Sequence, residues 1–251
     1  MTTSSTRYRE DEWQTRVDLA ACYRLIAHYG MTDLIYNHAT ARLPGSESHF
    51  LINPYGLLYQ EITASSLITI DLEGRVIDPG DSGLDINRAG YVVHSAVHAA
   101  RHDVQCVIHT HTRAGMAISA LECGLLPLTQ TAMRFADIRY HDYQSVAIDE
   151  TERAQIAADL GDGSAMILRN HGLLVAQPTV AQAFNTLYWL ELACRSQVDA
   201  MSCGAPLRMP SPEIIEKTHH LYQPTTRRPF GELEWPAMLR LLDSQDASYR
   251  S

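Results

Sequence analysis

Two short apolar segments that each run directly into a histidine constrain the fold of this chain more than any other feature. The first is QCVIHTH, at residues 105–111, and the second is AMILRNHG, at residues 165–172. Each apolar run has the length of a buried strand and is too short for a typical helix. Segments with helical periodicity flank both runs, so we expect strands and helices to alternate here.

The rest of the chain continues this alternation. Apolar residues at helical spacing predict helices at about residues 10–29, 87–101, 113–122, 150–160, 180–201 and 212–222. Shorter strand-like pieces, with turn residues between them, are HFLIN, SLITIDL, RVIDPG, DIRYHDY and LLVA. Strands that alternate with helices predict an α/β fold built in layers.

The sequence predicts one large domain between two less regular ends. Residues 1–8 are polar and rich in Ser and Thr, which predicts disorder. No break in composition divides residues 9–225, and 45% hydrophobic residues in a chain of 251 suffice for one sizeable core. The tail, residues 226–251, contains Phe230 and Trp235, and we expect it to pack on its own or a neighbouring subunit.

The charge and the cysteine content exclude several classes of protein. A net charge of −9 and a pI of about 5.7 provide no basic surface for nucleic acid or for an anionic membrane. No apolar run approaches the roughly 20 residues of a membrane helix, and the N-terminus lacks the apolar stretch of a secretion signal. Five cysteines without a CxxC pair predict reduced, packed thiols and a cytoplasmic protein.

His109 and His111 are separated by one residue at the end of the first strand-like segment. In an extended chain, residues i and i+2 point to the same face and lie roughly 6.6 Å apart. Both rings can therefore reach one cation through metal–nitrogen bonds of about 2.0–2.1 Å. The alternative is a pair of surface histidines, because this spacing indicates a metal site only once a third ligand is found.

His171 is the first candidate for that third ligand. It follows the second buried strand, and Asn170 and Gly172 on either side favour a turn that lets the backbone come close. His141, in the segment RYHDY, is a second candidate, with a substrate contact or a strand-surface position as alternatives. The sequence therefore offers several possible partners for the histidine pair, since the helical histidines at residues 94, 98 and 102 could also form a two-histidine chelate.

The remaining histidines have weaker claims to a site. His94, His98 and His102 share one helix face at a spacing of four residues. We expect His94 to pack near the site and His102 to face solvent, and the role of His98 stays open. A lone histidine is more often structural than a ligand, which is our interpretation of His28, His38 and His49.

The segments VIHTHTRAG and ILRNHGLLV together resemble the class II aldolase/adducin family. The likeness extends from about residue 11 to about residue 222, and it is most specific in INPYGLLYQEITASSLITID and YHDY, which resemble the adducin head domain and its bacterial relatives. The resemblance implies a three-layer αβα sandwich and a ring-shaped homotetramer with active sites at the subunit interfaces. It also implies that His109, His111 and His171 bind a divalent metal, usually Zn²⁺, with Fe²⁺, Mn²⁺ or Co²⁺ as alternatives.

The chain departs from the sugar-phosphate aldolases of this family at several positions. The resemblance places their acid/base glutamate at residue 90, where this chain has glycine. Where those enzymes hold the substrate phosphate, this chain has Arg88, Tyr55 and Gly56, whereas Asn37 fits the asparagine of the phosphate loop. Arg88 and Tyr55 would suit an anionic substrate such as a carboxylate, or they are structural.

The missing glutamate determines which chemistry we expect. A bound metal can polarise a carbonyl and stabilise an enediolate, but forming that enediolate needs a positioned base, typically worth about 10²–10⁴ in rate. The candidates are Tyr222, since related enzymes bring a C-terminal tyrosine across an interface, and Tyr140 or Asp142.

Three functions fit this set of residues. The first is a metal-dependent lyase that acts on a small carbonyl or carboxylate compound by aldol cleavage or decarboxylation. The second is a non-haem iron oxygenase that uses the same three histidines. The third is a non-catalytic scaffold module like the adducin head, because loss of the glutamate is what decay of activity would produce.

Overall fold

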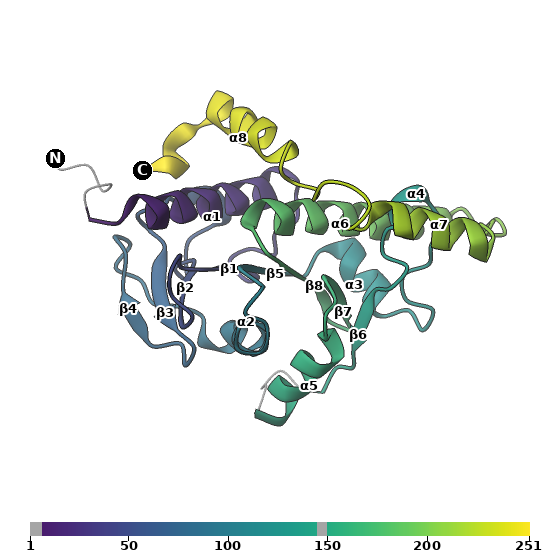
Figure 1. Cartoon of the computed structure of the whole chain (residues 1–251), viewed down its shortest axis with the longest axis horizontal. Coiled ribbons are helices and arrows are strands. Elements are labelled where there is room, and N and C mark those ends of the chain that lie inside the picture. Colours follow the sequence, from purple (N-terminus) through teal and green to yellow (C-terminus); the bar gives the residue numbers. More distant parts are fainter. Residues whose placement is uncertain (1–6, 145–149) are drawn as a thin grey trace.

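A computed structural model describes residues 7–144 and 150–251 of the chain (Figure 1). Over these residues, eight strands form one sheet in the order β4-β3-β2-β1-β5-β8-β7-β6. Every neighbouring pair is antiparallel except β6 and β7. The strands are β1 (His38–Arg42), β2 (His49–Ile52), β3 (Ile68–Asp71), β4 (Val76–Asp78), β5 (Cys106–Thr110), β6 (Arg139–His141), β7 (Ala165–Leu168) and β8 (Gly172–Gln177).

Helices cover both faces of the sheet, which confirms the expected three-layer αβα sandwich (Figure 1). One face carries α1 (Glu10–His28), α3 (Arg113–Ser119), α4 (Gln130–Met133) and α6 (Val180–Ser202), with α8 (Glu234–Gln245) packed outside α1 and α6. The other face carries α2 (Arg88–Ala100) and α5 (Glu150–Leu160). Helix α7 (Pro212–Tyr222) lies beside α4, and short 3-10 turns occupy Tyr59–Glu61 and Ala247–Arg250.

Strand β5 lies in the middle of the sheet and is buried on both faces. Successive side chains of a strand point to opposite faces. Ile108 accordingly packs in the large core under α1 and α6, and Val107 packs in the smaller core under α2 and α5. A strand buried on both faces needs a continuous apolar run, which is why CVI precedes the histidines.

Strand β1 is the central strand that the sequence does not reveal. Its residues, HATAR, are all buried although three of them are polar. The Thr40 hydroxyl lies 2.9 Å from Nδ1 of His94 and 2.8 Å from Nε2 of His98, and Arg42 donates to the backbone carbonyl of His98 at 2.8 Å. These hydrogen bonds offset the cost of burying polar groups, so the strand needs no apolar pattern on this face.

The two ends of the chain pack on the domain where the structure describes them. Residues 1–6 of the expected disordered segment lie outside the described residues, whereas Tyr8 stacks on Trp13 at 5.9 Å. In the tail, Trp235 is buried and its indole N–H donates to Asp18 of α1 at 2.9 Å. The tail therefore covers α1 of its own chain.

The five cysteines are all free, but only Cys22, Cys106 and Cys194 are buried. Cys123 and Cys203 are exposed, so the expectation of packed thiols is wrong for these two, which lie at helix ends rather than on apolar faces. Among the described helices, none combines the length and the apolar character that crossing a membrane requires.

A buried tyrosine, Tyr23, joins α1 to β1 and to the end of β2. The hydroxyl of Tyr23 accepts from the backbone N–H of Ala39 at 2.9 Å and lies 2.9 Å from Oδ1 of Asn53. The side chain is fully buried, so no water can replace these partners. Tyr23 thereby fixes β1 and the residue after β2 relative to α1.

Replacing Tyr23 with Phe should lower the free energy of unfolding by about 1–3 kcal/mol, because it leaves buried polar groups without a partner. Tyr59→Phe is a matched control, since Tyr59 is equally buried and packs on Tyr23 at 4.6 Å, while its hydroxyl makes only a 3.4 Å contact. We expect the control to cost less than about 1 kcal/mol in urea unfolding. Equal losses in both variants would contradict the role assigned to the Tyr23 hydroxyl.

Candidate metal centre

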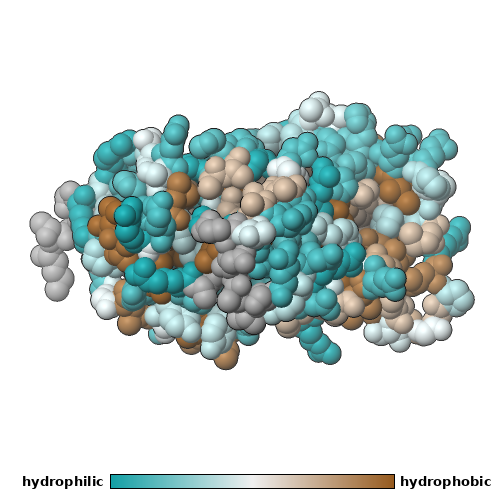
Figure 2. Space-filling view, turned by 90° about the horizontal axis from the view of Figure 1, so that it is seen from below, coloured by the Kyte–Doolittle hydropathy of each residue, from teal (hydrophilic) through white to brown (hydrophobic). Residues whose placement is uncertain are grey.

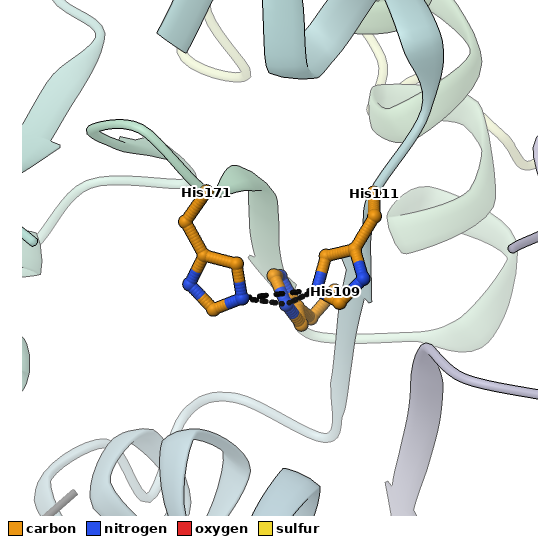
Figure 3. Close-up of side chains that lie close together, drawn as sticks. All are labelled: His109, His111 and His171. Carbon is orange, nitrogen blue, oxygen red and sulfur yellow. Dashed lines mark hydrogen bonds between the residues drawn. The ribbon is translucent and has the colours of Figure 1, made fainter. Parts of the chain in front are cut away.

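Three histidine rings meet at the end of β5 (Figure 3). His109 and His111 come from β5 and the residue after it, and His171 comes from the turn between β7 and β8. Their Nε2 atoms lie 2.8 Å apart for His109 and His111, 2.9 Å for His111 and His171, and 3.2 Å for His109 and His171. The structure therefore brings together the three residues that the sequence singled out.

The contacts of the other ring nitrogens determine what these short distances mean. Nδ1 of His109 lies 2.9 Å from the carbonyl oxygen of Leu173, and Nδ1 of His111 lies 3.1 Å from a carboxylate oxygen of Asp33. Both oxygens only accept, so each Nδ1 carries a proton, and in a neutral ring the Nε2 atom then presents a lone pair. Between two neutral rings, the 2.8 Å contact of these Nε2 atoms, drawn as a dashed line in Figure 3, is therefore not a hydrogen bond.

A cation resolves this repulsion. Three nitrogens about 2.0–2.1 Å from a tetrahedral metal lie about 3.3 Å from one another, close to the separations observed here. Burial, reinforced by the neighbouring rings, holds the pKa of His109 well below its usual range, and burial lowers the pKa of His171 to about 4. Both rings are thus uncharged at neutral pH, as metal ligands must be.

The turn that carries His171 is fitted closely to β5. Asn170 has a left-handed backbone with φ of 55°, and the N–H of His171 donates to the Leu168 carbonyl at 3.1 Å. A Cβ on Gly172 would overlap the carbonyl oxygen of Thr110 in β5. Glycine at 172 therefore permits the close approach that the sequence predicted from the residues flanking His171.

Asp33 is a functional candidate that the sequence analysis missed. It lies in the loop between α1 and β1, and its carboxylate holds the His111 ring in the orientation described above. Carboxylates that accept from a metal-binding histidine fix its tautomer and raise its basicity. A lone aspartate 78 residues from its partner carries no sequence signal for this contact.

Asn37 lies beside the centre, as expected from the resemblance. Its left-handed backbone, with φ of 76°, aims its side chain so that Oδ1 accepts from the backbone N–H of His111 at 2.9 Å. The side chain is 1% exposed, and its Nδ2 has no hydrogen-bond partner among the described residues. A buried donor of this kind is costly unless a ligand uses it.

The other candidates for substrate binding, in the turn after β2 and at the start of α2, do not touch the three rings in the described structure. Arg88 is the first residue of α2, with its guanidinium 61% exposed and 3.8 Å from Asp85. The ring of Tyr55 lies 6.3 Å from that of Tyr36, and Gly56 has a φ of 119° that favours glycine. Both substrate contact and a structural role stay open for Arg88 and Tyr55.

Within one chain, the structure does not bring the proposed acid/base residues to the centre. The Tyr140 hydroxyl accepts from the backbone N–H of Leu125 at 3.0 Å, and the Tyr222 ring lies 5.5 Å from that of Phe230. Asp142 is exposed. The tyrosine near the centre is instead Tyr143, whose half-exposed ring lies 6.1 Å from that of His171 and which the sequence analysis overlooked.

The remaining histidines divide between the core and the surface. His94 and His98 are fully buried on the α2 face, and His102 is exposed as expected. Nδ1 of the buried His141 lies 2.8 Å from Asp159, which makes this ring part of the α5 interface rather than a member of the three-histidine group. His38, interpreted as an isolated structural residue, is the direct cross-strand partner of His109.

Comparison with known proteins gives one consistent family. The family model described as "Class II Aldolase and Adducin N-terminal domain" matches residues 17–198. The chain is 48% identical to a Pseudomonas aeruginosa protein named as a candidate class 2 aldolase, over 95% of this chain and 93% of that one. It is 40% identical to alpha-adducin of Mus musculus over 96% of this chain, which spans 34% of that protein.

Two solved structures share the fold closely. An aldolase II superfamily protein from Pseudomonas syringae matches with a TM-score of 0.94 and 47% identity, covering 98% of each chain. A structure titled L-fuculose 1-phosphate aldolase, from Glaciozyma antarctica, matches with a TM-score of 0.84 and 29% identity, covering 100% of this chain and 96% of the other.

Replacing Asp33 with Asn should weaken zinc binding by about 10- to 100-fold, because the neutral amide no longer supports the basicity of His111. The measurement is a competition titration against a chromophoric chelator. Asp162→Asn is the control, since Asp162 pairs only with the exposed Arg139. Equal affinities in the two variants would remove Asp33 from the centre.

The buried His98 should make the metal-free protein sensitive to acid. Burial lowers the pKa of His98 to about 3, so the unfolded chain binds a proton below about pH 6.5 that the folded chain does not. Stability contributed by the neutral ring is present above pH 6.5 and is lost as the pH falls from there towards 3. Urea unfolding at pH 7 and pH 5 should show a loss roughly 2 kcal/mol larger for the natural chain than for His98→Gln. If the natural chain and His98→Gln lose the same unfolding free energy between pH 7 and pH 5, His98 is not buried in its neutral form.

Proposed function

The chain belongs to the class II aldolase and adducin N-terminal domain family, and from this premise we propose that it is a divalent-metal-dependent lyase. Its substrate in this proposal is a small carbonyl or carboxylate compound, and the reaction is aldol cleavage or decarboxylation. The observation that carries the proposal is the convergence of three Nε2 atoms, of which that of the neutral His109 presents a lone pair.

The ligand set favours Zn²⁺, because three histidines with a free fourth position are typical of catalytic zinc. Such an ion polarises a carbonyl oxygen and stabilises negative charge that develops on the substrate. The protein's part is to hold the imidazoles of His109 and His111 in place through Leu173 and Asp33. Fe²⁺, Mn²⁺ and Co²⁺ are accepted by similar ligands.

The polar groups around the centre support an anionic substrate. Asn37 offers a buried amide donor without a partner among the described residues, and Arg88 places a guanidinium at the start of α2. A guanidinium binds a carboxylate through two parallel hydrogen bonds. A sugar phosphate is the less favoured substrate, although one similar structure is titled as such an aldolase, because residue 90 is Gly rather than the glutamate expected from the resemblance.

Tyr222 is the acid/base group that we favour, acting on the centre of a neighbouring subunit in a homotetramer. Helix α7, which ends at Tyr222, buries none of its residues within the chain, and Ile214 and Leu221 are 48% and 53% exposed. Figure 2 shows a face that is largely hydrophilic, with hydrophobic residues gathered towards its two ends. Exposed apolar residues on one helix, such as Ile214 and Leu221 on α7, are typical of a protein interface.

The adducin likeness supports one competing function, a non-catalytic scaffold module. This chain is 40% identical to alpha-adducin and lacks a carboxylate at residue 90. The two functions differ at the metal: catalysis needs a coordination position open to solvent, whereas a structural ion has a closed shell of four protein ligands. Iron with oxygen uptake after anaerobic purification would instead favour an oxygenase.

The lyase proposal is tested by two variants that damage different parts of the site. His111→Ala should lose bound metal and all turnover of a panel of small hydroxy and oxo acids, with the fold retained. Tyr222→Phe should keep the metal but lose about 10²–10⁴ in kcat. Mixing the two inactive proteins after dissociation should restore activity, because some interfaces then combine intact histidines with an intact tyrosine.

His102→Ala serves as the control, since that residue is exposed in the turn after α2 and lies outside the cluster. It should match the natural chain in metal content and turnover. Normal metal content in His111→Ala would overturn the metal centre. Full activity of Tyr222→Phe, or no recovery on mixing, would remove Tyr222 from the mechanism.

A further inference from the structure

Gly90 and His38 occupy the same small volume beside the metal centre. Gly90 lies in the first turn of α2, and the ring of His38, from β1, lies against its α-carbon. A Cβ added to Gly90 would come within 3.0 Å of both Nε2 and Cδ2 of that ring, a separation that real Cβ atoms essentially never show. No side chain fits at residue 90 while the His38 ring keeps its place.

The His38 ring is held on both sides. Its Nδ1 lies 3.2 Å from Oδ1 of Asn53, and its Nε2 lies 3.3 Å from Nδ2 of Asn87. With the carboxamides oriented in this way, Nδ1 donates and Nε2 accepts. The same Asn87 caps α2 by accepting from the N–H of Gly90 at 3.4 Å. His38 therefore connects β1 to the first turn of α2.

The ring has little freedom to move aside. It is 3% exposed, and its Asn53 partner also lies 2.9 Å from the buried Tyr23 hydroxyl. Displacing the ring would break both of its hydrogen bonds inside the core, which is costly because buried polar groups need partners. A side chain at residue 90 would have to push against this network rather than against a mobile surface group.

The pair lies next to the metal ligands. His38 and His109 are direct partners in the antiparallel pairing of β1 with β5, so their side chains share one face of the sheet with Cβ atoms about 4.5–5.5 Å apart. Asn37, the preceding residue, binds the backbone of His111. The volume shared by residues 38 and 90 therefore lies on the same face of the sheet as the side chain of His109, on the neighbouring strand.

We propose that His38 and Gly90 form a matched pair that determines which group stands beside the metal centre. The imidazole of His38 fills the space that a side chain of α2 would need, so the chain presents a hydrogen-bonded ring there and excludes a carboxylate at residue 90. His38 is a positioning residue in this account, since it sets the first turn of α2, with Asn87 and Arg88, against the centre. Without a fixed carboxylate at this place, the site accepts the negative charge of a substrate carboxylate.

A stability cycle on the metal-free protein tests the pair without any assumption about function. Gly90→Ala should lower Tm by about 3–10 °C, because the added methyl overlaps the ring. In a His38→Ala background the same change should be neutral or raise Tm, since alanine favours a helix over glycine. A His98→Ala background, which removes a different buried ring of the same layer that packs on Phe50, should retain the penalty. Equal effects of Gly90→Ala in all three backgrounds would overturn the pairing.

A cobalt titration tests the consequence for the centre, and this arm rests on the proposed function. In His38→Ala/Gly90→Glu, the new carboxylate can approach the ion, so cobalt should bind at least tenfold tighter and its visible absorption should change. Gly90→Glu alone should show neither effect and a lowered Tm. If the double variant binds cobalt like the natural chain, the pair does not determine what stands beside the metal. If the natural chain binds no cobalt, the proposed function fails while the stability cycle still decides the pairing.

Discussion

Two imidazole rings whose Nε2 atoms lie 2.8 Å apart, and whose lone pairs face each other when both rings are neutral, are the constraint on which the rest of this structure depends. Left alone, such an arrangement is repulsive, and the fold maintains it by fixing the opposite nitrogen of each ring. A backbone carbonyl of β8 holds His109, and a carboxylate from the loop before β1 holds His111. The packed core thus supplies the energy that keeps the site in a conformation suited to a cation.

The central sheet shows how this energy is provided. β5 contributes its apolar residues to the cores on both faces and leads directly into the ligand pair. Displacing the two histidines would therefore require displacing a strand that is packed in both cores. β1, its neighbour, pairs His38 opposite His109 and buries Thr40 through hydrogen bonds to two further rings. The side of the sheet that faces α2 therefore combines an apolar core with a group of buried histidines, two of which are linked by the Thr40 hydroxyl.

The sequence revealed the parts of this arrangement that depend on local spacing. The separation of His109 and His111 predicted a shared face, and the glycine after His171 predicted a close turn. The strand β1 escaped detection because its burial is stabilised by hydrogen bonds to residues more than 50 positions away rather than by an apolar pattern. The contact of Asp33 with His111 and the overlap of His38 with residue 90 escaped for the same reason, since neither has a local signature.

The third ligand comes from a different part of the fold than the other two. His109 and His111 share one rigid strand end, whereas His171 arrives on a separate hairpin tip, where the N–H of Asn170 donates to the carbonyl of Ser119 at the end of α3. Two of the three ligands thus come from one strand end, and the third comes from a separate turn that is hydrogen-bonded to α3. Because Ser119 accepts from the turn that carries His171, a substitution that shifts the end of α3 would displace the third ligand and leave the strand end that carries the other two in place.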